Sequence, residues 1–134
     1  MTFSWKIFLG VLVFMLLVDV AWLTATGSFY KQQFGDISRL QEGTVLYWAG
    51  AVVYLVMAAS LVFFALPLVG ESWLGAALIG ALFGFSVYAV YDFTNLATLK
   101  HWPLILLAVD ISWGSTLGAL STLAAKFLRD KLAL

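Results

Sequence analysis

The sequence contains no cysteine and a single histidine, His101. The lack of cysteine excludes disulfide bonds, thiolate catalysis and metal sites built from thiolates. A single histidine also argues against a histidine-cluster metal site within one chain. The sequence has no glycine-rich phosphate loop and no nucleophile elbow, which argues against nucleotide hydrolysis and serine hydrolase chemistry. We therefore predict no metal and no cofactor.

Charged residues are scarce as well. They make up 10% of the 134 residues, whereas soluble domains contain about 25%. Hydrophobic residues make up 63%, and the mean hydropathy is +1.02. Seven lysines and arginines balance seven acidic residues, so the chain lacks the basic surface that nucleic acid binding requires. The composition predicts an integral membrane protein that contacts membrane lipids and has no nucleic-acid partner.

Four apolar runs are long enough to cross a membrane, which takes about 20 residues. They cover about residues 6–27, 44–66, 73–99 and 103–127. Asp19 interrupts the first run, which favours a retained helix over a cleaved signal peptide. We predict an all-α integral membrane protein: one transmembrane domain over residues 1–134, folded as a four-transmembrane-helix bundle.

Two short turns, near Pro67 and Pro103, predict that the helices they join are antiparallel neighbours. Four helices place both termini on the same side of the membrane. Four of the seven lysines and arginines lie on that side, which favours the cytoplasmic side. The one long polar connection, residues 28–43, shows apolar side chains at helical spacing. This pattern predicts an interfacial helix over about 29–40, with a solvated loop as the alternative.

Three aspartates, Asp19, Asp92 and Asp110, interrupt apolar runs. An aspartate at the centre of a transmembrane helix costs roughly 2.5–3.5 kcal/mol on insertion scales, so a functional role is the first hypothesis. Asp19 lies eight residues before Gly27, Asp92 eight before Lys100 and Asp110 eight after Trp102, so each is eight residues from the loop side. At 1.5 Å per residue, each is about 12 Å below the same surface. We predict a layer of three carboxylates. The alternative is that the acids are purely structural and only hydrogen-bond to neighbouring helices.

Positions three or four apart share a helix face, which brings four more polar or aromatic residues near the acids. The predicted ligand- or proton-binding residues are Asp19, Trp22, Tyr88, Asp92, Asn95, Asp110 and Trp113. Because the first and fourth helices are antiparallel, Trp22 is expected above the acid layer and Trp113 below it, as a lid and a floor. Acids this close cannot all ionise, so we expect at least one to hold a proton at neutral pH unless a cation lies among them. Tryptophan faces suit cationic or flat apolar ligands.

Two pairs of glycines, Gly80 with Gly84 and Gly114 with Gly118, allow close approach between helices. They either pack the bundle internally or form the seam of a homodimer. The sequence leaves both alternatives open.

Three segments of the sequence resemble a bacterial family of predicted membrane proteins, catalogued as domain of unknown function 2177. They are Val18-Asp-Val-Ala-Trp22, Tyr91-Asp-Phe-Thr-Asn-Leu-Ala-Thr-Leu-Lys100 followed by Trp102-Pro103, and Val109-Asp-Ile-Ser-Trp-Gly114. The resemblance covers essentially the whole chain. It implies a multi-pass, four-helix protein of the bacterial inner (cytoplasmic) membrane, and it implies no activity.

Three functions remain open. The favoured hypothesis is binding or transport of a small cationic or amphipathic solute, coupled to carboxyl protonation. The second is an intramembrane acid–base enzyme of the isomerase or hydratase type that acts on a lipid or an isoprenoid. The third is an assembly or partner protein without small-molecule chemistry.

Overall fold

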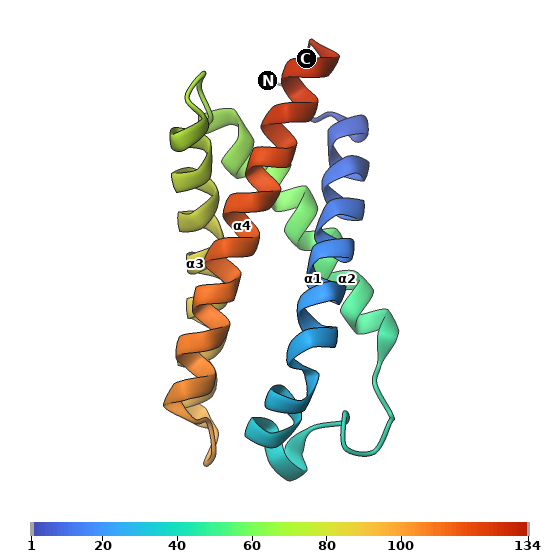
Figure 1. Cartoon of the computed structure of the whole chain (residues 1–134), viewed down its shortest axis with the longest axis vertical. Helices are drawn as coiled ribbons and strands as arrows, with labels where there is room; N and C mark the ends of the chain where they lie inside the picture. Colours follow the sequence, from blue (N-terminus) through green and yellow to red (C-terminus); the bar gives the residue numbers. More distant parts are fainter. Residues whose placement is uncertain (1, 134) are drawn as a thin grey trace.

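The computed structural model describes residues 2–133 and contains no strand in that range. Four helical spans are long and apolar enough to cross a membrane, which confirms the predicted all-α membrane fold. Both termini lie at the same end of the bundle (Figure 1). Which membrane face this end occupies stays a prediction. The main helices are α1 (Trp5–Phe34), α2 (Tyr47–Ser60), α3 (Trp73–Thr98) and α4 (Leu104–Leu132).

Helix α1 is longer than the sequence pattern predicts. It begins after Ser4, whose hydroxyl accepts a hydrogen bond from the Ile7 amide at 3.4 Å, and it continues without interruption to Phe34. The separate interfacial helix predicted over about 29–40 is therefore wrong. Residues 28–34 contain no proline or glycine, so nothing in the backbone stops the helix there. It ends at Gly35, whose φ of 61° favours glycine, and a short 3-10 turn, η1 (Gly35–Ile37), follows.

Helix α2 changes its hydrogen-bond pattern before a proline. The α-helical part is followed by a π-helical turn, η2 (Leu61–Ala65), and a 3-10 turn, η3 (Leu66–Leu68), which contains Pro67. Proline lacks the backbone N–H that a regular α-helix requires, so the last turns adopt other patterns. Together these segments form one span that runs obliquely behind α1 and α4 (Figure 1).

Close contacts at four glycines pack α3 against α4. Gly80 and Gly84 on α3 and Gly114 and Gly118 on α4 are all buried. A Cβ atom at Gly80, Gly84 or Gly118 would collide with the backbone of the facing helix, and one at Gly114 would collide with the Tyr88 ring. These glycines pack the bundle internally, the first of the two predicted alternatives. A homodimer seam through them is wrong, because the chain already covers them.

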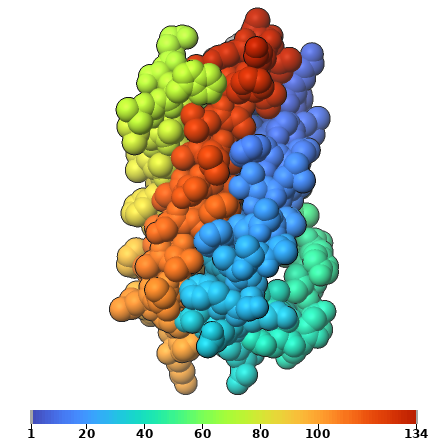
Figure 2. Space-filling model, viewed as in Figure 1, coloured from blue at the N-terminus to red at the C-terminus, as the bar shows by residue number. Residues whose placement is uncertain are grey.

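Two clusters of buried side chains hold the helices together. The larger lies toward the termini and includes the fully buried Val11, Met15, Leu61 and Leu117. The smaller lies near the α3–α4 turn and includes Tyr30, Trp102 and Leu106. Figure 2 shows α1 and α4 side by side over one face of the molecule. The candidate site lies where the two clusters meet.

Candidate functional site

The three aspartates are buried, and they lie on three different helices, α1, α3 and α4. Asp19 on α1 is 7% exposed, Asp92 on α3 is 0% and Asp110 on α4 is 9%. No lysine or arginine within residues 2–133 forms an ion pair with any of them. Buried carboxyl groups without a cationic partner require hydrogen-bond donors, a proton or a bound cation.

Aromatic donors supply hydrogen bonds to Asp19 from two other helices. The Tyr54 hydroxyl on α2 donates to one carboxyl oxygen. The Trp113 indole Nε1 on α4 donates to the other at 2.8 Å. Asp19 therefore ties three helices together at one point. Tyr54 is not among the predicted site residues, because nothing in a sequence shows which tyrosine faces an acid on another helix.

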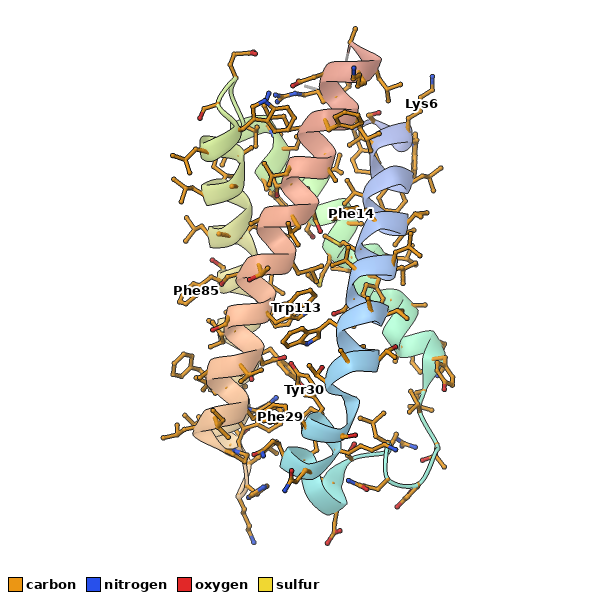
Figure 3. The ribbon with its side chains drawn as sticks, viewed as in Figure 1. Lys6, Phe14, Phe29, Tyr30, Phe85 and Trp113 are labelled. Carbon is orange, nitrogen blue, oxygen red and sulfur yellow. The ribbon has the colours of Figure 1, made fainter. Side chains whose placement is uncertain are left out.

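Trp22 and Trp113 stack face to face between α1 and α4. Their ring centroids are 4.4 Å apart and the ring planes differ by 4°. The predicted lid and floor on opposite sides of the acids is therefore wrong. The Trp22 indole donates to the Tyr30 hydroxyl at 3.3 Å, and Tyr30 donates to Asp110 Oδ1 at 3.1 Å. Figure 3 shows Trp113 and Tyr30 in the gap between α1 and α4.

Tyr30 was not among the predicted site residues, although the sequence contains a signal for it. It follows Asp19 by eleven residues, which is close to three full helical turns. The two side chains therefore share a face if the helix is continuous. The predicted helix ends near residue 27, so the sequence pattern does not place Tyr30 on the same helix as Asp19.

The continuous α1 also changes the predicted depth of the acids. Asp92 and Asp110 are each six residues from the loop-side end of their helices, and their carboxyl groups are neighbours. Asp19 pairs with Trp113, which lies three residues further from that end than Asp110. Trp22 also stacks on Trp113, and Asp19 precedes Trp22 on α1, so Asp19 lies nearer the termini than Asp110. The acids form a staggered row instead of one layer, and within residues 2–133 no three of them converge as metal ligands.

One oxygen of the Asp92 carboxyl group accepts a hydrogen bond, and the other has no hydrogen-bond partner. The Trp102 indole donates to its Oδ1 at 3.2 Å. Its Oδ2 is buried without any hydrogen-bond partner. A proton shared with the neighbouring Asp110 would satisfy this oxygen, because a protonated carboxyl is a hydrogen-bond donor. The predicted site residue Asn95 lies one turn further along α3 and does not line the cavity described below.

This geometry yields a spectroscopic prediction. At neutral pH the wild-type protein should show the infrared carbonyl band of one protonated carboxyl group. Asp92→Asn should remove it, because the asparagine amide can donate to Asp110 and so replaces the shared proton. Asp36→Asn, in the exposed η1 turn, is the control and should leave the band unchanged. A wild-type spectrum with only ionised carboxylates would contradict the shared proton.

A cavity of about 410 Å³ lies beside the stacked tryptophans. All four main helices contribute to its lining, with Asp19, Trp22, Tyr88, Asp110 and Trp113 from the predicted set. Tyr30, Phe34 and Tyr91 add further aromatic walls. Asp92 does not line the cavity, although it neighbours Asp110, which does. The structure thus brings five of the seven predicted residues to one space.

The cavity opens between α2 and α3. Val53 on α2 and Val87 and Tyr91 on α3 line it, and they are 53%, 38% and 52% exposed. Toward the termini it is closed by the larger core cluster, where Met57 is both a core and a lining residue. On its other side the stacked tryptophans separate it from a shallow hollow on the outer face of α1 and α4. Leu23 on α1 and Leu40 in the loop before α2 also line the cavity and are 44% and 36% exposed, so access is from the loop-side half of the bundle.

Comparison with known proteins agrees with the architecture. No curated protein and no solved structure gives a match to the chain. One family model matches residues 4–127, which include every residue that lines the cavity and all three buried aspartates. Because this match extends over nearly the whole chain, the protein belongs to the predicted membrane protein family DUF2177.

Proposed function

We propose that the protein binds one small amphipathic cation in the cavity beside the stacked tryptophans, which we call the aspartate cavity. We further propose that the chain lies in a bacterial inner membrane with both termini in the cytoplasm. The observation that carries the proposal is the lining of the cavity: two carboxyl groups, two tryptophans and three tyrosines around about 410 Å³. Proteins recognise quaternary ammonium groups with cages of aromatic side chains. The absence of an ion-pair partner for either acid within residues 2–133 leaves the charge free to complement a ligand.

The shape of the cavity favours binding over passage through the membrane. Transport would require access from both membrane faces. The fully buried core side chains Val11, Met15, Leu61 and Leu117 fill the bundle on the termini side. The lateral opening between α2 and α3 instead suits a ligand that arrives from the lipid phase. A transport cycle would need a second conformation in which this core opens.

A titration with decyltrimethylammonium, a quaternary ammonium amphiphile, tests the proposal. Lipid nanodiscs containing wild type should show saturable quenching of tryptophan fluorescence. Val53→Phe should weaken binding at least tenfold, because the larger side chain fills the opening. Val52→Phe is the matched control: Val52 is adjacent and similarly exposed, but it does not line the cavity. Asp110→Asn should also weaken binding about tenfold, which corresponds to about 1.4 kcal/mol.

Two results would contradict the proposal. One is equal binding by wild type, Val53→Phe and Asp110→Asn, which would indicate simple partition into the bilayer. The other is full competition by decanol, which has a chain of the same length and no charge.

A second candidate is an intramembrane acid–base enzyme. The arrangement of Asp110 and Asp92 favours it, because Asp110 faces the cavity while the neighbouring, buried Asp92 can exchange a proton with it. A proton donor inside an open, mostly apolar cavity is what double-bond isomerisation of a lipid requires, and hydration would require a water molecule in the cavity as well. Conversion of an added isoprenoid by wild type, and its loss in both Asp92→Asn and Asp110→Asn, would favour this function.

A further inference from the structure

A second hollow, which we call the apolar groove, lies on the lipid-facing side of α3 next to the aspartate cavity. Its volume is about 660 Å³. One wall is formed by the end of the second span, with Phe64 and Leu68, and the other by a stripe of α3. The α3 residues in the groove are Ile79, Leu82, Phe83, Ser86, Val87 and Val90.

The groove offers no free polar group. Ser86 is the one hydroxyl residue in its lining, and its Oγ already donates to the Leu82 carbonyl at 2.8 Å. Phe64, Leu68 and Leu82 are 64%, 71% and 65% exposed, so the groove is open along its length. It lies within spans that are apolar enough to cross a membrane. Its occupant must therefore be hydrocarbon.

Val87 lines both the groove and the aspartate cavity, so the two hollows are adjacent along α3. From Val87 the groove extends along α3 toward the termini as far as Ile79. Eight helical residues span about 12 Å. This is less than half of the roughly 30 Å hydrocarbon core, so one short alkyl chain fits.

We infer that the ligand of the aspartate cavity is a single lipid-like amphiphile whose cationic head lies near Asp19 and Asp110 and whose hydrocarbon chain follows the apolar groove. The inference rests on the proposed function, since the cavity must first hold the head. It adds the substrate class and the direction of the chain. The head lies nearer the α3–α4 turn and the chain points toward the end of the bundle that carries the termini.

Photolabelling tests this placement. Two analogues of decyltrimethylammonium are used in nanodiscs, one with a diazirine at the end of the chain and one with a diazirine beside the ammonium group. The chain-end probe should label the groove, at Leu68, Ile79 or Leu82. The head probe should label cavity residues such as Tyr88. Excess decyltrimethylammonium should remove both labels.

A pair of variants tests whether the chain end lies in the apolar groove. Leu82→Trp fills the groove and should reduce labelling by the chain-end probe at least fivefold, with labelling by the head probe retained. Leu78→Trp is the control, because Leu78 is 62% exposed on the same helix and lines neither hollow.

The outcomes separate the two proposals. Labelling by the chain-end probe that spreads evenly over the lipid-facing helices, with the cavity still labelled by the head probe, would overturn the inference and leave the proposed function intact. Groove residues that are protected in a dimer and unlabelled by either probe would indicate a second copy as the occupant and would also overturn it. Loss of specific labelling by both probes would reject both proposals.

Discussion

Gly84→Ala should lower the free energy of unfolding by about 3 kcal/mol, at the upper end of what overpacking costs. An alanine Cβ at this position would lie 2.8 Å from the Gly114 carbonyl carbon and 3.2 Å from Gly118 Cα, and closer still to the Gly114 oxygen. These are backbone atoms of α4, which cannot rotate away as a side chain does. The two helices must therefore separate along their whole contact. Thermal unfolding in one detergent, followed by circular dichroism, measures the effect.

Gly50→Ala is the matched control for this prediction. Gly50 lies inside α2, and no atom lies within 4 Å of the position that its Cβ would take. Alanine loses less backbone entropy than glycine in a helix, so this variant should be unchanged or more stable by about 0.5–1 kcal/mol. Equal stability of Gly84→Ala and Gly50→Ala would mean that α3 and α4 do not pack through these glycines.

Trp102→Phe should destabilise the protein by about 1–3 kcal/mol, the range expected when a buried hydrogen-bonding group loses its partner. Trp102 is 7% exposed, and its indole is the one hydrogen-bond donor to Asp92 within residues 2–133. Phenylalanine keeps an aromatic ring but leaves the fully buried carboxyl group without this partner. Trp48→Phe is the control, because Trp48 is 70% exposed. Unfolding in the same detergent measures both.

A double-mutant cycle separates this hydrogen bond from simple packing. In an Asp92→Leu background the carboxyl group is absent, so Trp102→Phe should cost much less than it does in wild type. If the loss were the same in both backgrounds, Trp102 would act only as a packing residue, and Asp92 would be satisfied in some other way.

The buried aspartates show how far the sequence alone could lead. The free-energy cost of placing a carboxyl group in hydrocarbon marks Asp19, Asp92 and Asp110 as candidate site residues, and the structure buries all three. The prediction of a single layer was wrong because it depended on where α1 ends. No proline or glycine follows Gly27 until Gly35, so the backbone propensity alone allowed the longer helix. The drop in hydropathy after residue 27 was taken as the helix end, although helices regularly extend beyond the apolar core.

The partners of the acids were less predictable than the acids. Tyr54, Tyr30 and Trp102 donate to them from positions 35, 80 and 10 residues away along the chain. Aromatic residues are common in membrane helices and at their ends, so composition does not mark these three. Their role follows from the crossing of α2 behind α1 and α4 (Figure 1) and from the close contact between α3 and α4.

The sequence by itself determined the membrane environment, the four helical spans and the three acids, because each follows from local hydropathy and from the cost of placing a charge in hydrocarbon. Only the tertiary structure decided how these parts meet. Glycine contacts hold α3 against α4, whereas the oblique second span leaves the cavity open between α2 and α3. The physical reason is that helix crossing depends on side-chain shapes from two segments at once, which hydropathy along one segment does not contain.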